Sequence, residues 1–157
     1  MAVFRYRMQS ILDIKLKMET QAKQEFAQAK LILDREEEKL ESLFEQKRFY
    51  EKQAAKLLSG KLDLLEIAAN KDAILKTEEY IVEQSKRVEK AKQMLEKARD
   101  KLREVMQERK VQEALKEKAF EAFLMEEKQQ ESKEIDQLTS YTYGQKLQAQ
   151  EKGSAEE

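Results

Sequence analysis

Apolar residues along most of the chain recur at alternating steps of three and four residues, the spacing of one face of an α-helix. Thirteen of the sixteen positions on this face between residues 4 and 57 are apolar. From Ile67 to Leu102 an aliphatic residue returns at every seventh position, which is the repeat of helices that wind around one another. The pattern predicts two long helices that pair through apolar seams.

One interruption separates the two patterns, at Ser59-Gly60-Lys61-Leu62. Gly60 is the only glycine before Gly144, and it fits the left-handed position just past a helix end. Asp63 can then cap the following helix. The sequence predicts an all-α fold in which two long helices form an antiparallel coiled-coil hairpin, with a helix over about 4–58, a turn over 59–62 and a helix over about 63–140.

The same signals predict the domain organisation. Residues 1–144 are expected to form a single antiparallel coiled-coil hairpin, and the polar residues 145–157 beyond Gly144 are expected to be a disordered tail. The second helix is the longer one. Folding it back at the turn brings Phe4 near residue 118 and leaves the apolar stretch 119–125 without a partner helix.

Composition supports a helical protein without catalytic chemistry. Ala, Glu, Lys, Arg and Leu dominate the chain, and it contains no His, Cys, Pro or Trp. Catalysis by Cys or His, disulfides and zinc sites of the usual kind are therefore excluded, and we expect no catalytic residue, cofactor or metal. The net charge of −1 gives no general attraction for nucleic acid. No apolar run is long enough to span a membrane, and the first residues do not resemble a signal peptide.

Several large apolar residues lie off the seams. Phe49 falls on the outer face of the first helix, Phe44 lies on its flank, and Tyr80 flanks the seam of the second helix. One interpretation is that these residues form a surface for a partner protein. The other is that a wide seam, as in a helical bundle, buries them within the fold. The sequence leaves both open.

Three stretches of the sequence resemble the flagellar export protein FliJ family of the type III export apparatus. The first is the opening Phe4-Arg5-Tyr6-Arg7-Met8-Gln9-Ser10-Ile11-Leu12-Asp13-Ile14-Lys15. The second runs from Ser59-Gly60 to Tyr80. The third contains Glu108-Arg109-Lys110, Leu115-Lys116-Glu117-Lys118, Phe123, Glu127 and Lys133-Glu134-Ile135-Asp136. In this order they cover nearly the whole chain.

The resemblance implies a non-enzymatic stalk, similar to the central shaft of rotary ATP synthases. Such a protein inserts its terminal end into the hexameric ring of the export ATPase FliI, touches the export-gate protein FlhA and escorts empty export chaperones. The implied location is the cytoplasm, peripherally at the inner membrane of the flagellar base. The expected ring contacts are Phe4, Met8, Ile11, Phe120, Phe123 and Leu124.

The gate-contacting flank of the family, carried over by position, is Lys39, Leu43, Gln46, Tyr50, Ala73, Thr77, Tyr80 and Gln84. Leu43, Tyr50 and Tyr80 keep the apolar or aromatic character of a contact surface. Together with the off-seam residues they give the expected gate contacts, Leu43, Phe44, Phe49, Tyr50 and Tyr80. Three alternatives stay open: the equivalent stalk of a virulence type III secretion system, a generic coiled-coil adaptor, and a helical arm that binds nucleic acid.

Overall fold

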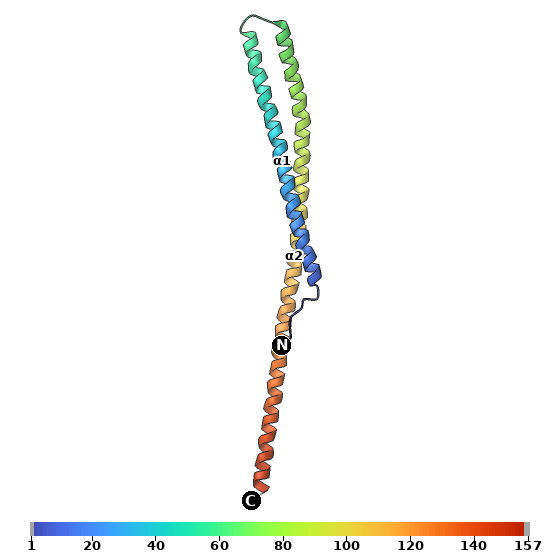
Figure 1. The fold of residues 1–157 in the computed structure, drawn as a ribbon, viewed down its shortest axis with the longest axis vertical. Helices are drawn as coiled ribbons and strands as arrows, with labels where there is room; N and C mark the ends of the chain where they lie inside the picture. Colours follow the sequence, from blue (N-terminus) through green and yellow to red (C-terminus); the bar gives the residue numbers. More distant parts are fainter. Residues whose placement is uncertain (1, 156–157) are drawn as a thin grey trace. The chain divides into compact units, whose positions relative to one another are not determined.

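A computed structural model describes residues 2–155, most of which form two long α-helices (Figure 1). Helix α1 spans Gln9–Leu58 and helix α2 spans Leu64–Ala155. The two helices pack against each other, and the described residues contain no strand. The predicted all-α helical hairpin is confirmed.

The chain divides into two compact units, each described by itself below. The hairpin unit comprises Lys15–Glu108, and the terminal unit comprises Met1–Ile14 with Arg109–Glu157. Met1, Glu156 and Glu157, which belong to the predicted hairpin domain and the predicted tail, lie outside the described residues. That residues 1–144 form one domain stays a prediction.

Polar contacts between the two helices show that the hairpin unit is antiparallel. Lys15 Nζ lies 2.7 Å from Glu108 Oε2, and Lys101 Nζ lies 3.5 Å from Glu25 Oε2. Nearer the loop, Lys47 Nζ lies 3.5 Å from Glu78 Oε1. The α2 number falls as the α1 number rises, as it does when a chain reverses at a single loop.

The core of the hairpin unit is a narrow seam between two helices. Leu33, Val88 and Ala91 form a buried cluster, and Leu40 and Leu95 pack against it partly buried. Two helices alone cannot enclose a wide core, so each seam residue keeps an edge in contact with water. Val88 and Leu95 belong to the predicted seven-residue repeat of aliphatic residues, and this repeat therefore faces α1.

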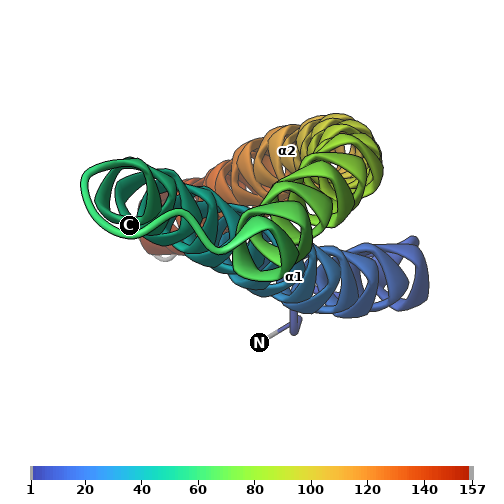
Figure 2. The same cartoon turned by 90° about the horizontal axis from the view of Figure 1, so that it is seen from above.

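The loop between the helices covers residues 59–63 (Figure 2). The Ser59 amide nitrogen and hydroxyl both donate to the Lys56 carbonyl oxygen, at 3.2 and 2.9 Å, and these bonds close the end of α1. Asp63 caps α2, since its Oδ1 accepts a hydrogen bond from the Leu65 amide at 3.1 Å. The left-handed conformation predicted for Gly60 is wrong, because no described glycine has a positive φ. A five-residue connection spreads the reversal over several ordinary conformations.

The start of the first helix differs from the prediction. Helix α1 begins at Gln9, whereas the apolar pattern placed the start near residue 4. No acidic residue lies in the first turn of α1, so the observed start has no side-chain charge to favour the amino end of a helix. An extended residue advances about 3.3 Å and a helical residue 1.5 Å. The non-helical segment before α1 therefore reaches further along α2 than a helix of the same number of residues would.

The end of the second helix also differs. Helix α2 continues through Gly144 to Ala155, so the predicted end near residue 140 and the predicted disorder of the described part of the tail are wrong. The Thr139 and Thr142 hydroxyls donate to the Ile135 and Leu138 carbonyl oxygens, both at 2.8 Å, so their polar groups are satisfied within the helix. A glycine inside a helix costs only about 1 kcal/mol, and the chain has no proline to force a break.

Candidate functional site

Three buried polar residues lie in the α2 seam of the hairpin unit at seven-residue intervals. Asn70, Thr77 and Gln84 are each less than 9% exposed. The next two positions of the same series are Ala91 and Ala98, which the sequence pattern had placed in the seam. Extending the alanine series backward by seven residues would have found the polar residues, but their polarity hid them from a search for apolar positions.

Two of these residues bind the backbone of the opposite helix. Asn70 Nδ2 donates to the Tyr50 carbonyl oxygen at 3.1 Å, and Gln84 Nε2 donates to the Glu36 carbonyl oxygen at 3.0 Å and to its carboxylate. The Thr77 hydroxyl donates within its own helix, to the Ala73 carbonyl oxygen at 2.7 Å. Buried polar residues in a coiled-coil seam fix which residues face each other. Thr77 and Gln84 are thus buried in the seam, although both belong to the carried-over flank.

A shallow groove lies along one flank of the hairpin unit; we call it the flank groove. Its lining includes Leu43 from α1 and Tyr80 from α2. Leu43 is half-buried, whereas the Tyr80 side chain is 58% exposed. Its other lining residues are polar or charged, among them Lys39, Gln46 and Gln84. Five positions of the carried-over flank therefore meet in one groove.

The other three expected gate residues lie outside the flank groove. The Phe49 ring, which is exposed, packs edge-on against the half-buried Tyr50 ring with 5.7 Å between the centroids. Phe44 lines a separate depression formed by α1 alone, together with Leu40. The five residues thus divide into one pair within the groove, one edge-on aromatic pair and one isolated phenylalanine.

The terminal unit contains a cluster of three phenylalanines, which we call the Phe4 cluster. The Phe4 ring lies 5.2 Å from the Phe120 ring at an interplanar angle of 67° and 5.5 Å from the Phe123 ring at 49°. Aromatic pairs favour such edge-on and tilted arrangements. The Tyr6 hydroxyl adds a hydrogen bond to Gln112 Oε1 at 3.0 Å. The segment that precedes α1 is therefore fastened to α2 at two points.

The six expected ring contacts all belong to the terminal unit, with different accessibility. Phe4, Met8 and Phe123 are partly buried, and the Met8 carbonyl oxygen accepts hydrogen bonds from the Ile11 and Leu12 amides. Ile11, Phe120 and Leu124 are exposed, the last two by 43% and 49%. Part of the aromatic surface is thus used within the fold, while Phe120 and Leu124 also present apolar surface to the solvent.

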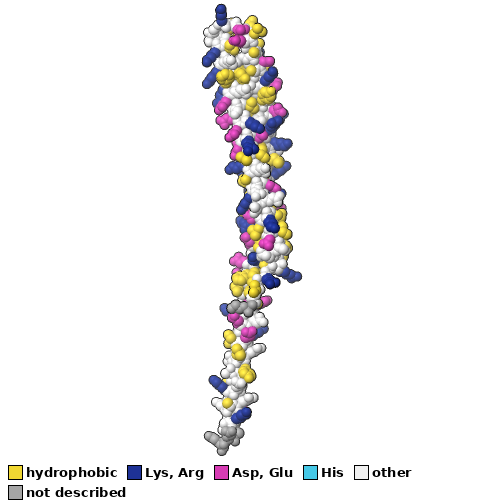
Figure 3. All heavy atoms as spheres, viewed as in Figure 1, with side chains coloured by type: hydrophobic (Ala, Val, Ile, Leu, Met, Phe, Trp, Pro, Cys, Tyr) yellow, Lys and Arg dark blue, Asp and Glu magenta, His cyan; other side chains and the backbone are white. Residues whose placement is uncertain are grey.

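Charges of both signs are mixed along the visible face (Figure 3). Among residues 2–155 no three acidic side chains gather closely enough to hold a metal ion. None of the helices over those residues has a stretch long and apolar enough to cross a membrane. An arrangement of long helices that expose separate apolar surfaces can bind partner proteins through those surfaces.

The fold and its surfaces define an all-α protein of the coiled-coil class, with exposed apolar surfaces suited to partners. The family model of the flagellar FliJ protein matches residues 4–148, and the chain belongs to the FliJ family. It is therefore a component of the flagellar export apparatus, in a family whose members are not enzymes. No curated protein and no solved structure is significantly similar to the chain.

Proposed function

We propose that the chain is the stalk of the flagellar export ATPase, with its terminal unit inserted in the ATPase ring. The observation that supports this most is the exposed apolar surface of Phe120 and Leu124, on a unit held together by the Phe4 cluster. An apolar surface of this kind on a monomer marks a partner contact. The proposed ring contacts are Phe4, Met8, Ile11, Phe120, Phe123 and Leu124.

A stalk acts on a ring through unequal contacts with its subunits. A stalk that bound all conformations of the ATPase subunits equally would shift no population, however tightly it bound. Leu124 and Phe120 lie on one face of α2, so they touch some subunits of a surrounding ring differently from others. This asymmetry favours one subunit conformation at a time, stabilises the assembled ring and stimulates ATP hydrolysis.

The flank groove supports a second role, contact with the export gate. Tyr80 is exposed beside Leu43, and a tyrosine supplies large contact area with a polar tip. We assign gate binding to Leu43, Phe44, Phe49, Tyr50 and Tyr80, all of which lie in the hairpin unit. The stalk would then work in the cytoplasm at the inner membrane of the flagellar base, and it would also escort empty export chaperones.

The test of the ring contact uses a FliI-type ATPase and the full chain. Leu124→Asp places a charge on the exposed face without removing any ring of the Phe4 cluster. We expect this variant to lose most of its stimulation of ATP hydrolysis and of ring assembly seen by electron microscopy. Leu65→Asp, at an exposed leucine of the hairpin unit, is the matched control and should stimulate normally. Full stimulation by Leu124→Asp would disprove the insertion.

A further inference from the structure

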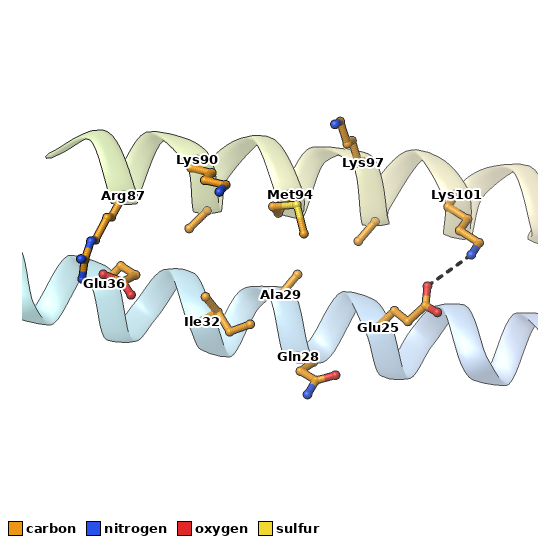
Figure 4. A pocket seen from close by; sticks show the side chains of 12 residues that line it. Glu25, Gln28, Ala29, Ile32, Glu36, Arg87, Lys90, Met94, Lys97 and Lys101 are labelled. Carbon is orange, nitrogen blue, oxygen red and sulfur yellow. Dashed lines mark hydrogen bonds and ion pairs between the residues drawn. The ribbon is translucent and has the colours of Figure 1, made fainter. Parts of the chain in front are cut away.

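A second groove of the hairpin unit differs from the flank groove in its chemistry. It has a volume of about 570 Å³ and lies between the α1 stretch 25–36 and the α2 stretch 87–101 (Figure 4). Ala29, Ala91 and Ala98 keep its floor low, and Ile32 and Met94 are about half-exposed along it. Ala29 and Met94 point toward the gap between the helices. We call this the apolar groove.

The α2 wall of the apolar groove is basic. All four of its charged residues are cationic, and they are Arg87, Lys90, Lys97 and Lys101. The two acidic residues on the α1 wall have partners within the hairpin, since Glu25 pairs with Lys101 and Glu36 accepts from Gln84. Lys90 and Lys97 form no ion pair with any described residue. An occupant of the groove must therefore be apolar on one face and acidic along its edges.

Residues 119–138 of α2 have this chemistry. Phe120, Leu124, Ile135 and Leu138 are exposed and fall on one helical face, because they repeat at helical spacing. Glu121, Glu127 and Glu134 flank this face, whereas Glu131 lies within it, seven residues from both Leu124 and Leu138. The whole stretch has six acidic residues and two lysines, a net charge of −4, whereas the residues lining the groove carry a net charge of +2.

We propose that the apolar groove binds residues 119–138 of a second copy of the chain. The basic wall of the groove would pair with the glutamates, and the alanine floor would receive the apolar face. The groove and its proposed occupant have similar lengths. The α2 wall extends about 21 Å, and the apolar positions from Phe120 to Leu138 extend about 27 Å at 1.5 Å per residue. The contact covers apolar side chains that are exposed when the chain is a monomer.

This association would regulate the stalk, a consequence that rests on the proposed function. Phe120 and Leu124 belong both to the docking face and to the proposed ring contacts. A self-associated chain would therefore withhold its ring-contact surface until the ATPase competes for it. Because Lys90 and Lys97 are not ring contacts, changing them tests self-association without touching the ring surface.

Sedimentation velocity of the full chain measures the association directly. We expect a monomer–dimer equilibrium that weakens as salt is raised, because charge pairs at a surface are screened. K90E/K97E and E127K/E134K should each weaken the dimer about tenfold, as the loss and reversal of two ion pairs predicts. An equimolar mixture of the two variants should associate again, because the reversed charges match across the contact. Failure of the mixture to associate would overturn the proposal.

The control variant makes the same change of charge as K90E/K97E, but at positions of α2 outside the groove. K92E/R103E reverses two exposed cations of α2 that do not line the groove, and it should dimerise like the unchanged chain. The chain has no native cysteine, so a Met94→Cys copy can be cross-linked to a Leu124→Cys copy with a bifunctional maleimide. Cross-linked heterodimers are expected. A chain that stays monomeric at every concentration, or that forms no cross-link between these two positions, would reject the docking. Stimulation of the ATPase by K90E/K97E would show that the proposed stalk function stands independently of it.

Discussion

The Asn70 side-chain amide, buried in the seam of the hairpin, donates a hydrogen bond across it to the Tyr50 carbonyl oxygen at 3.1 Å. Tyr50 lies inside α1, so this oxygen stands within the helical backbone. A register shift of one residue would separate the amide from this oxygen and leave a buried polar group unpaired. Asn70 therefore favours one alignment of the two helices over its neighbours.

Substitutions at Asn70 separate stability from alignment. Asn70→Ala removes the hydrogen bond and is expected to lower the free energy of unfolding by about 1 kcal/mol. Asn70→Leu buries apolar surface in the same seam and should be more stable than the alanine variant by about 1–2 kcal/mol. The leucine variant should also populate other pairings, because polar seam residues specify register at a cost in stability. Denaturant unfolding and cysteine cross-linking across the seam measure the two effects; a leucine variant less stable than the alanine variant would contradict this.

The sequence predicted the elements of the fold because their signals are periodic. Val88 and Leu95 stand at seven-residue spacing, and both face α1 as expected. The buried Asn70, Thr77 and Gln84 escaped because they occupy apolar positions with polar side chains. The polar partners of Asn70 and Gln84 are the Tyr50 and Glu36 carbonyl oxygens of α1, which no local pattern in α2 reveals.

The helix ends were predicted less well, since they depend on small energies. Gly144 was expected to end α2, yet its cost of about 1 kcal/mol is not enough to break a long helix. In the segment before α1, Phe4 contacts Phe120 and Phe123, and these contacts join positions more than a hundred residues apart. Among the proposed gate contacts, Phe44 and Phe49 came from their positions off the seams and the others from resemblance. Their grouping into a groove, an edge-on pair and an isolated ring required the structure.

Gly60 provides a test of the loop. Its φ is not positive, and a Cβ atom added there would meet no atom within 4 Å. Gly60→Ala is expected to raise the free energy of unfolding by about 0.4–1 kcal/mol, because the unfolded chain loses conformational freedom. Asp63→Ala, which removes the cap of α2, should lower it by about 1 kcal/mol. Thermal unfolding of both variants checks the pair, and a clear destabilisation by Gly60→Ala would mean that the loop needs a glycine conformation.

The segment before α1 should open when its anchors are removed. Arg5 and Arg7 are exposed and provide trypsin sites beside Phe4 and Tyr6. Phe4→Ala removes both aromatic contacts and should speed cleavage at these arginines about tenfold, since each contact contributes roughly 0.5–1.5 kcal/mol. Tyr6→Phe removes only the hydrogen bond to Gln112 and should have a smaller effect. Mass spectrometry of the released peptides gives the rates.

The control for the segment is Val3→Ala, because Val3 is 79% exposed. Its cleavage rate should match that of the unchanged chain. If Phe4→Ala were cleaved no faster than Val3→Ala, the phenylalanine cluster would not be what holds the segment on α2.

The flank groove predicts which of the proposed gate residues matter most. Leu43→Ala with Tyr80→Ala removes both apolar side chains of the groove, and we expect this variant to lose pull-down of an FlhA-type gate protein. Tyr80 is largely exposed, so stability should change mainly through Leu43, by about 1 kcal/mol because that leucine is only half-buried. Phe44→Ala is the matched control, because Phe44 lies in a separate depression of α1. Its binding should fall less than that of the groove variant, and both variants should still stimulate the ATPase. Equal loss of binding in the two variants would mean that the gate contacts α1 broadly and does not depend on the groove.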